Sequence, residues 1–191
     1  MKIKLVTATH FADYAEHLKS LSDEDRRTRF GYAASTTAID ALILNMLYNQ
    51  TEHRLFAGFD AEDNIVGFGH LARDSEDWEL AVSVAAQHQG RGYAGELIEH
   101  MIAWGKVNNV HSVFMHCITE NKKIQHLSRK FGLKTVERSG NEITAEVALP
   151  EPTAMDYTVE LWREQQSLVA DIVKLQRRLI RSLTGRLSNE A

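Results

Sequence analysis

The sequence has little cysteine or proline and no long hydrophobic run. Cys117 is the single cysteine among 191 residues, so no disulfide can form within the chain. The longest apolar runs, 41–44 and 101–104, are far shorter than the about 20 residues of a membrane-spanning helix. No apolar signal-peptide core follows the first residues, Met1–Lys4. These absences exclude a disulfide-stapled secreted domain and a transmembrane helix, and they predict a cytoplasmic protein.

An excess of positive charge is also missing. The chain has 22 Lys and Arg against 26 Asp and Glu, a formal net charge of −4, which argues against a nucleic-acid binder. With 43% hydrophobic and 25% charged residues, the composition is that of a globular protein able to bury a core. The nine histidines are scattered, and neither His-Glu-x-x-His nor Cys-x-x-Cys occurs, so we expect no metal site.

The two prolines, Pro150 and Pro152, lie together and mark a boundary. Residues 1–150 carry alternating helix and strand patterns, which predict one α/β (α+β) domain. Residues 151–191 carry leucines at helical spacing from Leu161 to Leu187, which predict an amphipathic C-terminal helical extension. We expect the extension to pack on its own core or form a homodimer, with docking on a partner or a membrane surface as the alternative.

Hydrophobic periodicity and turn residues predict seven strands and five helices in the first domain. The strands are expected at 2–7, 54–59, 65–72, 78–84, 113–118, 134–138 and 142–148. The helices are expected at 11–21, 22–29, 37–48, from the glycine-containing loop to 107, and at 122–131. The near-continuous apolar run 113–118 predicts a buried strand with parallel neighbours.

Two glycines, Gly90 and Gly92, lie in the loop 87–95 between a predicted strand and a predicted helix. Glycine allows positive φ and close approach of the backbone to a ligand. The free amides of a helix N-terminus bind anions, above all phosphate, and Arg91 offers a further charge contact. The loop therefore predicts a phosphate-bearing ligand, with a purely structural turn as the alternative.

Three phosphate-binding patterns compete for this loop. A P-loop requires Gly-Lys-Ser/Thr, which is absent. The dinucleotide fingerprint Gly90-x-Gly92-x-x-Gly95 is present, with Glu120 near the end of the next strand. Residues 85–89, however, separate the fingerprint from its strand, and the flanking strands do not form a βαβ series. A nicotinamide dinucleotide is therefore the weaker alternative.

The third pattern fits the loop best. Gln89, Gly92 and Ala94 match the acetyl-CoA signature of the GNAT acyltransferases, Gln/Arg-x-x-Gly-x-Gly/Ala, which this loop resembles. Residues 121–133 resemble the second motif of that family, Asn-x-x-Ala-x-x-Leu-Tyr-x-Lys-x-Gly-Phe. The resemblance covers residues 1–148 and implies the GNAT fold, a mixed, mostly antiparallel twisted sheet flanked by helices. It further implies transfer of acetyl from acetyl-CoA to a primary amine, either a protein lysine or a small amine, by direct attack.

The resemblance also places coenzyme A along the loop and the preceding strand. It implies that the pyrophosphate rests on the amides of 89–94 and that pantetheine pairs with the strand 78–84. The thioester would then enter the gap where this strand diverges from 113–118. The cofactor-binding residues implied in this way are Val82, Ser83, Val84, Gln89, Gly90, Arg91, Gly92, Tyr93, Ala94 and Asn121.

The attacking amine must be neutral, so a base or a water relay is useful. Residues 78–82 and the segment Leu21–Phe30 are most similar to Pat-type protein lysine acetyltransferases, which implies that Glu79 is the base. The alternative for Glu79 is an ordinary exposed carboxylate, and Glu120 is a second candidate base or a helix cap.

Ser128 occupies the position of the family's tyrosine, which protonates the departing CoA thiolate. A serine hydroxyl is too weak an acid to replace the phenol. Either another group acts as the acid, the thiolate leaves without a proton, or the activity is weak. A non-catalytic acyl-CoA sensor or interaction module with the same fold is the alternative function.

Three arginines, Arg26, Arg27 and Arg29, lie in the short helix predicted at 22–29. They either gate an acidic or phosphorylated substrate or form a solvated helix face, and the solvated face is the favoured interpretation.

Overall fold

The computed structural model describes residues 1–163 and 165. The chain divides into two compact units, Met1–Glu151 and Pro152–Ala191. In the second unit, residues 154–163 form a helix, and the leucines from Leu168 to Leu187 lie outside the described residues. None of the helices in the described part of the chain is long and apolar enough to cross a membrane.

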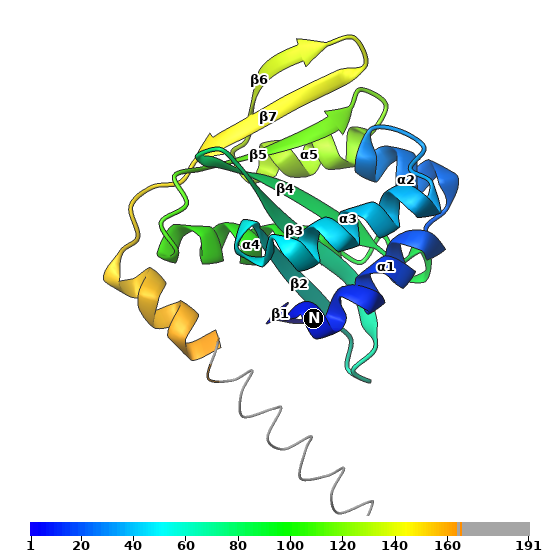
Figure 1. Cartoon of the computed structure of the whole chain (residues 1–191). Helices are drawn as coiled ribbons and strands as arrows, with labels where there is room; N and C mark the ends of the chain where they lie inside the picture. Colours follow the sequence, from blue (N-terminus) through cyan, green and yellow to red (C-terminus); the bar gives the residue numbers. More distant parts are fainter. Residues whose placement is uncertain (164, 166–191) are drawn as a thin grey trace, which may run out of the picture. The chain divides into compact units, whose positions relative to one another are not determined.

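The first unit is built on a seven-stranded sheet with the order β1-β2-β3-β4-β5-β7-β6 (Figure 1). Its strands are β1 (Lys2–Val6), β2 (His53–Phe59), β3 (Ile65–Asp74), β4 (Asp77–Val84), β5 (Ser112–Ile118), β6 (Lys134–Ser139) and β7 (Glu142–Ala148). Every pair of neighbours is antiparallel except β4 and β5. The prediction of a mixed, mostly antiparallel sheet is therefore confirmed.

The prediction of parallel neighbours for β5 is wrong on one side. β4 is its parallel neighbour, but β7 pairs with it in antiparallel register along its whole length. The turn at Ser139–Asn141 brings β7 back beside β5 and leaves β6 at the edge. A continuous apolar run reports that a central strand is buried, and burial alone does not determine the direction of its neighbours.

Five helices flank the sheet, close to the predicted positions. They are α1 (Phe11–Ser20), α2 (Asp23–Phe30), α3 (Thr36–Tyr48), α4 (Tyr93–Val107) and α5 (Lys122–Lys130). The Oγ atom of Ser22 accepts a hydrogen bond from the Asp25 amide at 3.0 Å and so caps α2. The helix ends at Gly31, whose φ of +78° is the left-handed conformation that glycine adopts most easily.

Helices cover both faces of the sheet (Figure 1), and each face has its own core. The core on one face is formed by α4 with β2–β5, and α5 packs against it. Its fully buried side chains include Phe56, Leu80, Leu97, Ile98 and Met101. The core on the other face is formed by α1 and α3 with β2 and β3. Its fully buried side chains include Tyr14, Leu18, Ile39, Met46 and Phe68.

The parallel pairing of β4 with β5 is very short. It joins Trp78 to Val113 and Glu79 to Phe114 and extends no further along either strand. β4 nevertheless stays paired with β3 as far as Val84, and β5 stays paired with β7 as far as Ile118. The two strands therefore diverge after Glu79 and open a gap in the middle of the sheet.

A buried polar contact joins α1 to the diverging part of β4. The Nε2 atom of His17 lies 2.9 Å from the Oγ atom of Ser83, and both side chains are buried. Burial, together with the nearby charge of Arg29, lowers the pKa of His17 from 6.5 to about 4. His17 is therefore a neutral hydrogen-bonding group at pH 7.

This shift makes stability depend on pH. Unfolded His17 takes up a proton near pH 6.5, whereas the folded protein resists this down to about pH 4, so stability should fall as the pH drops through that window. The full contribution is on the order of 3 kcal/mol. In His17→Gln, urea unfolding from pH 7 to pH 4 should show a shallower loss of unfolding free energy. His111→Gln, at an exposed site, is the matched control, and an equal change in both variants would contradict the assignment.

Candidate active site

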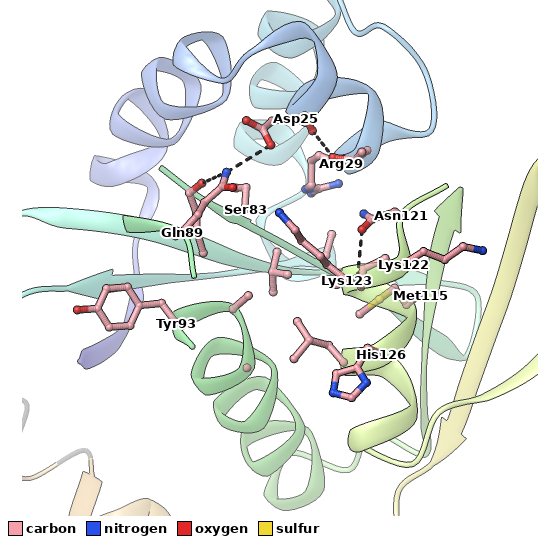
Figure 2. Close-up of a pocket in the computed structure, with 18 of the residues that line it drawn as sticks. Asp25, Arg29, Ser83, Gln89, Tyr93, Met115, Asn121, Lys122, Lys123 and His126 are labelled. Atoms are coloured by element: carbon pink, nitrogen blue, oxygen red, sulfur yellow. Dashed lines mark hydrogen bonds between the residues drawn. The ribbon is translucent and has the colours of Figure 1, made fainter. Parts of the chain in front are cut away.

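A cavity of about 810 Å³ lies in the gap between β4 and β5 (Figure 2). Its walls come from α2, from β4, from the loop before α4 with the first turn of that helix, from β5 and from the start of α5. The divergence of β4 and β5 after Glu79 therefore brings five segments around one space.

The glycine loop forms one end of this cavity. Gly90 and Gly92 have φ angles of +76° and +86°, and a Cβ atom on either would have no heavy atom within 4 Å. The first hydrogen bond of α4 runs from the Glu96 amide to the Gly92 carbonyl at 3.2 Å. The amides of Tyr93 and Ala94 precede this bond at the positive end of the helix dipole. This end of the cavity therefore suits an anion such as a pyrophosphate.

Gln89 holds the loop in place. Its Nε2 atom donates hydrogen bonds to the Val84 carbonyl and to Oδ1 of Asp25, both at 3.3 Å. The other carboxylate oxygen of Asp25 accepts a hydrogen bond from Ser22 at 2.8 Å. The side chain of Gln89 thus joins the end of β4 to the first turn of α2, as Figure 2 shows.

Nine of the ten residues predicted to bind the cofactor line the cavity, and they are Val82, Ser83, Val84, Gln89, Gly90, Gly92, Tyr93, Ala94 and Asn121. The tenth, Arg91, is exposed and does not line it. Asn121 also caps α5, because its Oδ1 atom accepts a hydrogen bond from the Ile124 amide at 3.1 Å. His88 also lines the cavity, and its buried Nδ1 atom has no hydrogen-bond partner in the described part of the chain.

A second cavity, of about 340 Å³, adjoins the first. The residues that line both are Arg29, Glu79, Ala81 and His116. Glu79 occupies the last paired position of β4 before the gap, so its carboxylate lies at the junction of the two spaces. This junction is where a base could meet a substrate that enters from the second cavity.

Glu120 lies in a different environment. It lines the large cavity but is exposed, accepts a hydrogen bond from Asn141 at 2.9 Å and lies 3.7 Å from Arg27. The Asn141 hydrogen bond is the main cause that lowers the pKa of Glu120, so its carboxylate holds a proton less readily than an ordinary glutamate. The alternative role predicted for Glu120, capping of the helix after Asn121, is filled by Asn121 itself.

Ser128 lines neither cavity. Its side chain is buried, and its hydroxyl donates a hydrogen bond to the Gln125 carbonyl one turn earlier in α5 at 3.0 Å. The structure therefore keeps Ser128 apart from Glu79 and from the gap between β4 and β5.

Two residues of the second cavity were missed by sequence reasoning, His70 and His116. Buried His70 lies with its Nε2 atom 3.1 Å from Nδ1 of His53, and burial lowers the pKa of His70 well below its ordinary value. The alternation of Phe68, His70 and Ala72 along β3 was the available signal, because alternate residues of a strand share one face.

The described residues hold no group of three or more His, Cys, Asp or Glu side chains able to ligate a metal. The donors of the large cavity include backbone amides at a helix N-terminus and the side chains of Lys122 and Lys123 at the start of α5. This set fits the phosphate groups and the extended pantetheine arm of a coenzyme A thioester.

Known proteins share both the sequence pattern and the fold. The chain is 31% identical over 97 residues to spermidine N(1)-acetyltransferase of Vibrio cholerae serotype O1, a match that covers 47% of this chain and 56% of that protein. The chain thus spans about half the length of this curated relative.

Solved structures of acetyltransferases share the fold of this chain. The V. cholerae spermidine N-acetyltransferase in complex with CoA and spermine has a TM-score of 0.63 at 17% identity and covers 77% of this chain and 94% of its own. The ribosomal-protein-S5-alanine acetyltransferase of Vibrio fischeri has a TM-score of 0.59 at 15% identity and covers 77% and 92%.

A family profile, acetyltransferase (GNAT) domain, matches residues 2–134, which is well over half of the chain. This match includes the glycine loop, the strands on both sides of the gap and the helix that begins after Asn121. The chain belongs to the GNAT acetyltransferase family.

Proposed function

We propose that this protein transfers the acetyl group of acetyl-CoA to a primary amine by direct attack. One observation carries the proposal: a large cavity runs from a helix N-terminus with two positive-φ glycines into the gap between β4 and β5. A carboxylate, that of Glu79, lies where this cavity meets a second one. The site therefore has separate spaces for an anionic cofactor and for an amine.

Bound acetyl-CoA supplies an activated acyl group whose thiolate is a good leaving group. The amides of Tyr93 and Ala94 hold the phosphates, and the open edge of β4 offers backbone groups for the pantetheine arm. Glu79 accepts a proton from the incoming ammonium group, directly or through water, so that the neutral amine can attack. Ser128 has no part in this step, because the modest pKa of a thiol allows the thiolate to leave without a proton.

A small amine is the acceptor that we favour. The second cavity, of about 340 Å³, has the volume of a small-molecule site. The names of related proteins include a spermidine N(1)-acetyltransferase and a ribosomal-protein-S5-alanine acetyltransferase. A protein lysine is the other acceptor, because Leu21–Phe30 resembles a segment of the Pat-type lysine acetyltransferases.

We further propose that residues 1–150 form the catalytic domain and 151–191 a helical extension that mediates homodimer or partner contact. We also propose that the protein is cytoplasmic, where such an enzyme would draw on acetyl-CoA.

A non-catalytic acyl-CoA sensor is the second candidate function, and the observation that favours it is the burial of Ser128 away from both cavities. Release of CoA in the presence of amines separates the enzyme from the sensor.

Substitution of Gly92 tests whether the glycine loop binds the cofactor. In Gly92→Trp the indole would project into the space for the phosphates, so calorimetric titration with acetyl-CoA should show at least about a tenfold loss of affinity. Gly140→Trp is the matched control, because Gly140 also has a positive φ and open space but lies in the β6–β7 turn. Unchanged affinity in a folded Gly92→Trp protein would remove the loop from the cofactor site.

Glu79 makes a second prediction. Glu79→Gln should lower kcat by about 10²-fold at low pH, where most of the amine is protonated and needs a base. The deficit should shrink as the pH rises, because the amine is then neutral without help. Steady-state CoA release across a pH series measures this, with Glu76→Gln in the exposed β3–β4 turn as control. A rate equal to wild type at every pH would show that Glu79 is not the base.

Ser128 makes a third prediction. Ser128→Ala removes one hydroxyl that forms a hydrogen bond within α5. The kcat and the KM for acetyl-CoA, measured by CoA release, should therefore stay close to those of the wild type. A large loss of kcat in a variant that keeps its thermal stability would instead identify Ser128 as the acid.

A further inference from the structure

The three arginines of α2 have different surroundings. Arg26 forms an ion pair with Asp23, and Arg27 lies 3.7 Å from Glu120. Arg29 instead turns toward the sheet, and its Nη2 atom donates a hydrogen bond to the Tyr14 hydroxyl at 3.1 Å. Figure 2 shows its side chain directed from α2 into the cavity. The expectation of a uniformly solvated arginine face is therefore wrong for Arg29.

Arg29 lines both cavities without an anionic partner. Within the described part of the chain, no carboxylate lies within 4.0 Å of its guanidinium, which packs 4.9 Å from the centroid of the Phe30 ring. Its buried Nε atom has no hydrogen-bond partner. A partly buried charge is costly unless it is paired, so an anion bound at this wall of the cavity would be stabilised by Arg29.

The neighbours of Arg29 supply no such anion. His17 and His70 lie close enough for its charge to add to the effect of burial in lowering both of their pKa values. Both are therefore neutral at pH 7 and add no second positive charge. Arg29 is therefore available to pair with an anion of the substrate or of the cofactor.

The second cavity also carries negative groups. Glu79 and Glu142 line it together with Arg29, and neither lies within ion-pair distance of that arginine. The space therefore presents separate sites for a cation and for an anion. A guanidinium pairs best with a carboxylate, which it can bind through two parallel hydrogen bonds.

We propose that the acceptor is a primary amine that also carries a carboxylate, as a free amino acid does. Arg29 binds the carboxylate, and this contact directs the amine to Glu79. The inference rests on the proposed acetyl transfer and narrows its acceptor. A polyamine such as the spermine named with one structural neighbour has no carboxylate, and its charges would be repelled by Arg29.

Matched pairs of acceptors test this proposal. CoA release is measured with L-lysine and cadaverine, with L-ornithine and putrescine, with L-phenylalanine and phenethylamine, and with spermidine. Each pair differs by one carboxylate, and kcat/KM should be at least about tenfold higher for the carboxylated members that are accepted. Equal or higher values for the decarboxylated amines or for spermidine would overturn the proposal.

Variants of Arg29 test whether this residue causes the preference for carboxylated acceptors. Arg29→Gln should raise KM for the carboxylated acceptors by at least about tenfold, leave KM for acetyl-CoA near wild type and raise kcat/KM for the plain amines, which the guanidinium no longer repels. Arg29→Lys, which keeps the charge but loses the planar fork, should give an intermediate result. Arg26→Gln is the matched control, because it removes the same charge from the same helix outside both cavities. A rise in KM for acetyl-CoA alone would place Arg29 at the cofactor and overturn the proposal.

A binding experiment separates this inference from the proposed function. If no amine releases CoA, the acetyl transfer fails, and the same pairs are titrated calorimetrically into protein saturated with CoA. Tighter binding of the carboxylated members, lost in Arg29→Gln and weakened in Arg29→Lys, would still support an anion site at Arg29. Equal binding or no binding of both members of every pair would overturn it.

Discussion

The site depends on the point at which β4 stops pairing with β5. Backbone amide and carbonyl groups inside a protein need partners, and β4 keeps these on its β3 side while its other edge opens after Glu79. Leu80 and Met115 anchor the two diverging strands in the core shared with α4, so the gap has packed walls. The cavity, the glycine loop that follows β4 and the start of α5 after β5 are all positioned by this divergence.

Charge divides the site into two halves. The half near the glycine loop offers a helix N-terminus and lysines of α5, which together favour phosphate. The other half combines the carboxylates of Glu79 and Glu142 with the guanidinium of Arg29. Because α2 supplies both Asp25, which holds the loop through Gln89, and Arg29, one short helix borders both halves.

Local features of the site could be predicted because neighbouring residues determine them. Gly90 and Gly92 signal positive φ angles before a helix, and the structure has both. The family was also predictable, because two sequence motifs at a set separation carried the resemblance. The directions of the two neighbours of β5 could not be predicted, since an apolar run such as 113–118 reflects burial and holds no information on strand direction.

The sequence by itself determined the elements, the glycine loop with its positive φ angles and the family, because periodicity, capping residues and short motifs encode these within a few residues. Only the tertiary structure decided which arginine of α2 faces the cavity and that Ser128 is buried away from it. The helix Asp23–Phe30 is polar almost throughout, so no hydrophobic stripe in its sequence distinguishes a buried face from a solvated one. Its orientation is determined by packing against strands far away in the chain, and that packing brings Arg29 to the same two cavities as Glu79.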